Sequence, residues 1–330
     1  MNRRETILAL LALGAAGGPR AVDAQQSKDK SARIGILVSG SNAQRGHLEQ
    51  ALLEGLREQG YVEGKNLVLE RRYAEGRRGR TPEFARELAA MKLDAIITTC
   101  TPSTRAAKQA TASTPIIMAA VADPVGQRLI ASLARPGGNI TGLSSQAEDI
   151  LAKMMELFSE VLPKAATVAV FLQGRSDVHP RMWQKLVPIA QALDLKLVKI
   201  DVANLAHIPA AFDMVLREKA DALFLLPDEP MFPNGRALIV ELAARHRLPA
   251  FYGVREFVDA GGLMSYGENL RTAYRKAASY VNSVAQGANA GDLPVQQPTR
   301  FEFVINQNTA RALGITIPRS LLARADYVIQ

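Results

Sequence analysis

A run of hydroxyl side chains in this sequence has the residue types of an anion-binding site. Thr99–Thr104 holds three threonines, a serine, a cysteine and a proline directly after an apolar run. Proline near a helix start leaves backbone N–H groups unpaired, and the positive end of the helix dipole favours an anion there. We predict that Thr99, Thr101, Ser103 and Thr104 hold a carboxylate. An equal alternative is that the hydroxyls only cap the helix.

Polar and aromatic side chains follow other apolar runs as well. Ser39 and Ser41 come after the first run, and we add their hydroxyls to the predicted ligand-binding set. Asp123 and Asp228 follow later runs, where a carboxylate can pair with an amine. Asp123 could instead cap the next helix, and the prolines around Asp228 equally suggest an exposed turn. Tyr252 is predicted to supply an aromatic wall.

Catalysis and metal binding find little support in the same residues. Cys100 stands before a predicted helix, a setting that lowers a thiol pKa, but a cysteine nucleophile also needs a base. The histidines are scattered outside any nucleophile or metal motif, at positions 47, 179, 207 and 246. The chain lacks a Gly-x-Gly-x-x-Gly motif after the first strand, a Walker loop and a Gly-x-Ser-x-Gly motif. We therefore predict no catalytic residue, no metal and no cofactor.

These residues are placed by short β-branched runs that alternate with helical-period stretches. This alternation is typical of an α/β fold with a parallel sheet covered by helices. Ligands of such sheets bind outside the carboxyl ends of the strands. The predicted strands are Arg33–Val38, Leu67–Arg72, Asp94–Thr99, Pro115–Ala119, Asn139–Leu143, Thr167–Leu172, Lys196–Asp201, Ala222–Leu226 and Pro249–Tyr252. The predicted helices are Gln44–Gln59, Thr81–Met91, Ser103–Ala112, Val125–Ala134, Arg181–Leu193, Ile208–Glu218 and Gly235–His246.

The two halves of the chain repeat in register, which predicts two similar Rossmann-like lobes. Ile34–Leu37 matches Val168–Phe171, and Thr114–Ile116 matches Leu248–Ala250 at the same offset of 134 residues. Glycine-rich or proline-rich segments near 137–145, 261–267 and 292–298 predict three crossovers between the lobes. We expect the N-terminal lobe at 32–143 plus about 265–294, and the C-terminal lobe at 144–264 plus about 295–330. An alternative explanation of the matching segments is that any two α/β domains look alike in such short sequence patterns, without a true repeat.

Length and composition agree with a folded, two-domain chain. The 330 residues are 48% apolar, which is too many for a disordered chain. One cysteine can form no internal disulfide and no cysteine-rich zinc site. The net charge of +8 comes in good part from five arginines in Arg71–Arg80, where interspersed glycines favour a solvated loop over a phosphate-binding stripe.

The first residues resemble an export signal, so we expect the protein in the periplasm. Arg3 and Arg4 precede the apolar run Ile7–Gly18, and Val22–Ala24 has small residues at the positions that precede a cleavage site. We predict a signal at 1–24. The apolar run is too short to cross a membrane as a helix. A protein outside the cytoplasm is not expected to bind nucleic acid, and the general or twin-arginine export route stays open.

Several motifs together resemble one family, the ABC transporter substrate-binding proteins of the tryptophan/tyrosine-permease type. The motifs include Gly60–Asn66, Arg135–Gly142, Gly261–Gly267, Leu293–Pro298 and Ser320–Asp326, and they run in the family's order over nearly the whole chain after the signal. The sequence departs from the family at Gln173–Arg175, where relatives often have an Asn-Pro pair, and at Cys100, where glycine or alanine is usual.

The resemblance implies a type I periplasmic binding protein without enzymatic activity. Two lobes joined by three crossovers would close on an amino acid or similar carboxylate and present it to an inner-membrane ABC permease. The family pattern implies that Thr101–Thr104 holds the ligand's carboxylate, Asp123 and Asp228 its amine, and Tyr252 its side chain. We expect a monomer. The alternatives are a periplasmic ligand sensor for a membrane receptor and an exported enzyme that uses Cys100.

Overall fold

The computed structural model describes residues 31–330 except 78, 177 and 228–230, and of residues 43–45 it describes the backbone alone. Residues 32–330 form one compact unit. The predicted export signal at 1–24 and the candidate Asp228 lie outside the described residues.

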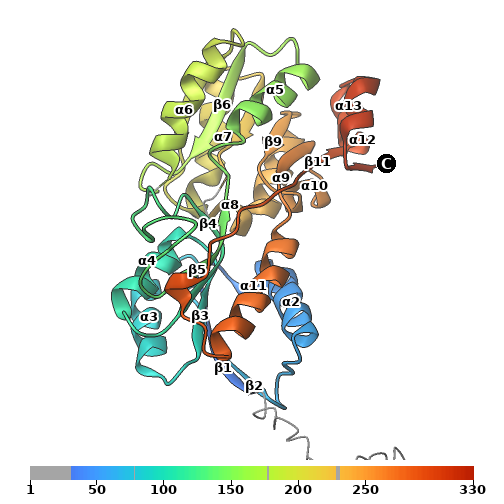
Figure 1. The fold of residues 1–330 in the computed structure, drawn as a ribbon. Coiled ribbons are helices and arrows are strands. Elements are labelled where there is room, and N and C mark those ends of the chain that lie inside the picture. Colours follow the sequence, from blue (N-terminus) through green and yellow to red (C-terminus); the bar gives the residue numbers. More distant parts are fainter. Residues whose placement is uncertain (1–30, 78, 177, 228–230) are drawn as a thin grey trace, which may run out of the picture. The chain divides into compact units, whose positions relative to one another are not determined.

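The first half of the chain builds a five-stranded, all-parallel sheet with the order β2-β1-β3-β4-β5 (Figure 1). Its strands are β1 (Ala32–Val38), β2 (Leu67–Tyr73), β3 (Ala95–Thr98), β4 (Ile116–Ala122) and β5 (Ile140–Ser145). Every residue of β4 is buried because helices cover both faces of the sheet. One face packs against α3 (Arg80–Ala90) and α4 (Thr101–Ala110), and the other against α2 (Asn42–Glu58) and α11 (Leu270–Ala285).

The second half builds a seven-stranded sheet with the order β12-β11-β10-β9-β8-β6-β7. All its pairings are parallel except that of β10 with β11. The strands are β6 (Thr167–Leu172), β7 (Lys196–Asp201), β8 (Ala222–Leu225), β9 (Ala250–Tyr252), β10 (Met264–Glu268), β11 (Phe301–Asn306) and β12 (Tyr327–Ile329).

Helices cover both faces of the second sheet as well. One face packs against α5 (Leu151–Val161), α6 (His179–Gln191), α12 (Gln307–Leu313) and α13 (Arg319–Arg324). The other packs against α7 (Ile208–Arg217), α8 (Met231–Asn234), α9 (Arg236–Arg245) and α10 (Glu256–Asp259). The rings of Phe158, Phe224 and Phe251 meet in the first of these cores, with centroids 5.7 to 6.5 Å apart.

The strand order confirms the internal repeat. The series β2-β1-β3-β4-β5 in the first sheet has its counterpart in β7-β6-β8-β9-β10 of the second. The matched segments Ile34–Leu37 and Val168–Phe171 lie in β1 and β6, which take the same place in that order. The second sheet then adds β11 and β12 at its edge. The prediction of an α/β fold with two parallel sheets is therefore confirmed.

The chain passes between the two sheets at three places. It leaves the five-stranded sheet after β5, returns after β10 to form α11, and leaves again before β11. Near the first and third passages Leu143 pairs with Gln296, and the Ser144 N–H donates to the Gln296 carbonyl at 2.9 Å. No helix within the described part of the chain is long and apolar enough to cross a membrane.

The predicted helix at Val125–Ala134 is wrong, because this segment is a series of turns. Asp123 and Arg128 have φ angles of 39° and 54°, in the left-handed region that interrupts a right-handed helix. Leu129 and Ile130 are nevertheless buried against the five-stranded sheet. The apolar spacing of the segment therefore marks core contacts without a helix.

Candidate ligand-binding cleft

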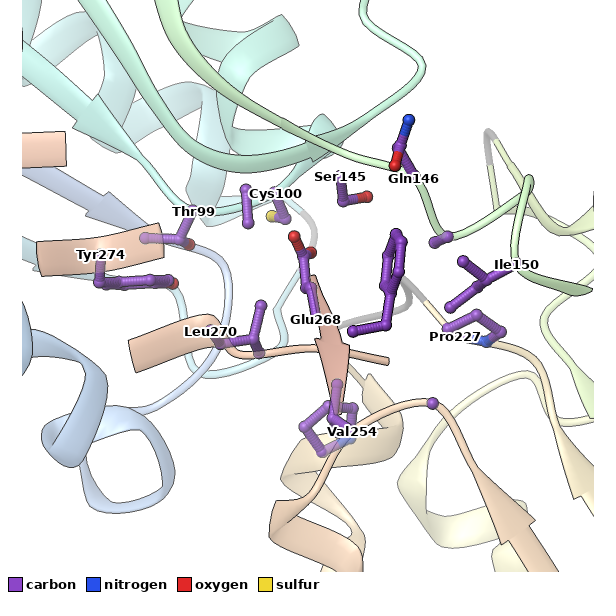
Figure 2. Close-up of a pocket in the computed structure, with 15 residues that line it drawn as sticks. Thr99, Cys100, Ser145, Gln146, Ile150, Pro227, Val254, Glu268, Leu270 and Tyr274 are labelled. Atoms are coloured by element: carbon purple, nitrogen blue, oxygen red, sulfur yellow. The ribbon is translucent and has the colours of Figure 1, made fainter. Parts of the chain in front are cut away.

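A pocket lies where the carboxyl ends of strands from the two sheets face each other (Figure 2). Thr99 and Cys100 follow β3, Gly253 and Val254 follow β9, and Glu268 ends β10. The cavity volume is about 60 Å³, which suits a few water molecules or a small ligand, so a ligand with an aromatic ring needs the walls to move apart.

Glu268 carries the one carboxyl group among the described residues that line this pocket, and these residues include no lysine, arginine or histidine. Figure 2 shows its carboxylate pointing from the end of β10 toward Cys100 and Ser145. Removal from bulk water disfavours the charged form and raises the pKa of Glu268 to about 8. Glu268 directly follows the predicted crossover segment 261–267 but is not among the site residues predicted from the sequence.

The other polar groups of the pocket are neutral. The Ser145 hydroxyl is buried and has no hydrogen-bond partner among the described residues. The Cys100 thiol lies 3.3 Å from the Ser39 hydroxyl and 3.4 Å from that of Ser103. Apolar side chains such as Ile150 and Leu270 supply most of the remaining wall.

Of the hydroxyls predicted to hold a carboxylate, that of Ser103 caps helix α4, whereas that of Thr101 is buried and has no hydrogen-bond partner among the described residues. The Ser103 hydroxyl donates to the Cys100 carbonyl and accepts from the backbone N–H groups of Thr99 and Cys100 at 3.1 and 3.2 Å. The Thr104 hydroxyl donates to the same carbonyl at 3.0 Å. Thr101 and Ser103 are fully buried. Among the four hydroxyl residues of the predicted cluster, Thr99 lines the pocket, next to Cys100. Ligand binding by the rest of the cluster stays a prediction.

The serines after β1 lie apart from this pocket. Ser39 lines a second cavity of about 510 Å³, which also takes its walls from both halves of the chain, with Arg77 and Arg105 on one side and Arg175 on the other. The contact of Ser39 with Cys100 joins the walls of the two cavities. Ser41 precedes α2 as its N-cap residue.

Asp123 forms a turn and an ion pair outside both cavities. Its Oδ1 accepts from the Gly126 N–H at 2.9 Å, and its Oδ2 lies 2.9 Å from Nη1 of Arg181 on α6. Arg181 also pairs with Glu148 at 2.8 Å, and Lys185 pairs with the same carboxylate. Asp123 therefore links the end of β4 to a helix of the second sheet.

Tyr252 packs in the core. Its side chain has no solvent exposure, and its ring stacks on Phe257 with centroids 4.5 Å apart. Burial raises the pKa of its hydroxyl. The residues that follow it, Gly253 and Val254, reach the pocket in its place. An aromatic wall from Tyr252 would require a change in this packing.

A buried histidine holds two strand ends of the second sheet in position. His179 Nδ1 accepts from the Gln173 N–H at 2.8 Å, and its Nε2 donates to the Pro227 carbonyl at 2.8 Å. Pro227 lines the pocket, so His179 supports the wall without touching the cavity. Burial lowers the pKa of His179 to about 4. A neutral ring with one donor and one acceptor fits both bonds.

Metal binding finds no site in the part of the chain that the structure describes, where no group of three or more histidine, cysteine or acidic residues converges.

The fold and the cleft define the class of the protein: two mostly parallel α/β sheets of repeated topology with a pocket between their strand ends are the architecture of a type I periplasmic binding protein.

The chain belongs to the ABC transporter substrate-binding protein family, whose model matches residues 33–329. A tyrosine-binding protein of Clostridioides difficile (strain R20291) is 27% identical over 287 residues, which are 87% of this chain and 82% of that protein. The family resemblance inferred from the sequence motifs is thereby confirmed.

Two solved structures have the same fold over 91% of this chain and 100% of theirs. A conserved domain protein from Vibrio cholerae is 29% identical with a TM-score of 0.84. An ABC domain in complex with L-Trp from Streptococcus pneumonia is 26% identical with a TM-score of 0.82.

Proposed function

We propose that this protein is the exported receptor of an ABC importer, which captures an amino acid or similar small carboxylate and delivers it to an inner-membrane permease. The observation that carries the proposal is the pocket between the strand ends of both sheets, because a ligand there contacts both lobes and favours their closed arrangement. The family of the chain and relatives that bind tyrosine or tryptophan support an amino-acid ligand.

The lobes follow the two sheets. We assign 32–143 and a second segment up to about 294 to the N-terminal lobe, and the rest to the C-terminal lobe. The second segment begins near Leu270, since β10 pairs with β9 and β11 while α11 packs on α2. The Asp123–Arg181 and His47–Glu256 pairs, at 2.9 and 3.1 Å, then join the lobes beside the cleft.

Binding without catalysis is the role that the cleft supports. The Cys100 thiol contacts two serine hydroxyls, and no histidine lies among the described residues of the pocket. A thiol nucleophile needs a base within hydrogen-bond reach, and the Glu268 carboxyl that points toward Cys100 forms no described hydrogen bond with the thiol. We expect a Cys100→Ser variant to keep its ligand affinity. A turnover that this variant loses would favour an enzyme instead.

A thermal-shift screen tests the proposal. The purified chain from Gln25 onward is mixed with amino acids, amines, small organic acids and sugars. A true ligand stabilises the folded protein by about 2.7 kcal/mol when it is present at a hundred times its dissociation constant. We expect at least one amino acid to raise the midpoint and to compete with its close analogues. If no member of the panel shifts the midpoint, the receptor function is refuted.

A further inference from the structure

The pocket contains a carboxylate without a cation. Glu268 has no hydrogen-bond or ion-pair partner among the residues that the structure describes, and no lysine, arginine or histidine is found among the described lining residues. Leu270, Ile150 and Pro227 contribute apolar surface to the same pocket (Figure 2). A carboxylate placed this way loses hydration and gains no counter-charge from the described residues of the pocket.

The titratable groups near Glu268 have other partners or stand farther out. Within the pocket they are Cys100 and Tyr274. Glu268 also borders two outer cavities. One of them has His47, Arg236, Arg255, Glu256, Asp259, Arg271 and Glu302 on its walls. The other has Lys276, Arg300, Glu302 and Tyr327.

Several of these outer charges are already paired. His47 pairs with Glu256 at 3.1 Å, Arg255 with Asp259 at 3.2 Å, and Arg300 with Asp326 at 2.6 Å. Removal from water raises the pKa of Glu268.

We propose that Glu268 binds the protonated amine of the ligand, so that the cleft selects small solutes carrying a cationic amine and rejects the corresponding acids that lack one. The inference rests on the proposed receptor function and specifies its ligand class. An ammonium group supplies the missing counter-charge, and its three N–H donors can also reach a neutral acceptor. The buried, unpartnered hydroxyl of Ser145 lies on the side toward which Glu268 points (Figure 2).

Binding by this route releases a proton. In the free protein the pKa of Glu268 is about 8, so its carboxyl is mainly protonated at pH 7 and must ionise when the ammonium binds. The release is about 0.9 proton per ligand at pH 7, and the affinity rises roughly eightfold from pH 7.0 to 8.5. A protonated Glu268 that donated to a ligand carboxylate would show the opposite, a weaker affinity at higher pH.

Calorimetry with two matched series of compounds tests the inference. L-alanine, ethylamine and propanoate form the first series, and L-tyrosine, tyramine and 3-(4-hydroxyphenyl)propanoate the second. Titrations at pH 7.0 and 8.5 in buffers of different ionisation enthalpy give both the affinity and the number of protons released. The variants are Glu268→Gln and, as a matched control, Glu302→Gln, whose side chain lies on the neighbouring strand and lines the outer cavities without the pocket.

We expect the amino acid of at least one series to bind, its deaminated acid to bind at least tenfold more weakly, and proton release to accompany binding. Glu268→Gln should lose at least tenfold in affinity at pH 8.5 and abolish the proton release, whereas Glu302→Gln should change neither. Thermal midpoints of the unliganded variants establish that both fold.

The inference is overturned if the deaminated acid binds as tightly as the amino acid, if binding takes up protons, if Glu268→Gln keeps its affinity, or if no amine of either series binds. A neutral or anionic ligand found in the broad screen would also overturn it and leave the receptor function standing. The absence of any ligand in that screen would refute the receptor function itself.

Discussion

Replacing His179 should remove much of the protein's sensitivity to acid. The imidazole is fully buried and neutral, since its two ring nitrogens bond the Gln173 N–H and the Pro227 carbonyl at 2.8 Å each. It also stacks on Phe232 with centroids 5.8 Å apart. Protonation would turn the acceptor Nδ1 into a second donor that faces an N–H group. The folded state therefore resists the proton that the unfolded chain accepts.

The size of the effect follows from the two pKa values. Burial lowers the pKa of His179 from 6.5 to about 4. Because the folded pKa lies below the unfolded one, the folded protein loses stability as the pH falls through 6.5, and the loss is complete near pH 4. It amounts to about 3 kcal/mol in total and about 2 kcal/mol between pH 7 and pH 5.

The assay is urea unfolding at pH 7 and at pH 5 for the wild type, His179→Gln and His207→Gln. A glutamine amide offers one donor and one acceptor in a neutral group, so His179→Gln should cost stability at pH 7 through lost ring packing. At pH 5 its deficit relative to the wild type should shrink by about 2 kcal/mol. His207, an exposed histidine, is the control, and its replacement should leave the pH dependence unchanged. A deficit of His179→Gln that is equal at both pH values would refute the reasoning.

Two further substitutions test the walls of the cleft. Gly267→Ala would place a Cβ 1.8 Å from the Gly253 carbonyl oxygen, so urea unfolding should show a stability loss of about 1–3 kcal/mol or more. The control is Gly79→Ala, whose Cβ would have nothing within 4 Å and which should cost far less stability. Equal losses in the two variants would contradict the packing argument. Asp123→Asn keeps the turn but loses the charge that faces Arg181. Because both side chains are more than a third exposed, we expect at most about a fivefold loss of ligand affinity by calorimetry and little change in the thermal midpoint. A hundredfold loss of affinity would mean that Asp123 contacts the ligand.

The elements of both repeated halves were predictable because apolar runs and their helical spacing record burial directly. Each strand predicted from the sequence overlaps an observed strand, and Thr167–Leu172 and Lys196–Asp201 agree in both bounds. No helix or strand was predicted after Tyr252, and that part of the chain includes β10, α11, β11 and β12. The helix α11 belongs to the first sheet's core although it follows a strand of the second. The glycine-rich segment 261–267 predicted a crossover there, but not the helix that follows it.

Site residues were harder to predict than strands. Position after a strand selected Thr99, which lines the pocket, but it also selected Tyr252, whose side chain packs in the core beside Phe257. The hydroxyls of Ser103 and Thr104 bond to the backbone of their own helix, because such bonds form within one turn and need no partner from elsewhere in the chain.

The sequence by itself determined the α/β class, the repeat of two halves and the family, because these depend on the spacing of apolar residues and on motifs contiguous along the chain. The tertiary structure alone decided which side chains share the cleft. Glu268 meets Thr99 and Ser145 only because the end of β10, where the chain makes its second passage between the sheets, lies against the strand ends of the first sheet. Whether Glu268 has a counter-charge depends on which side chains line the folded pocket, and no contiguous segment of the sequence contains that information; the described lining residues supply none.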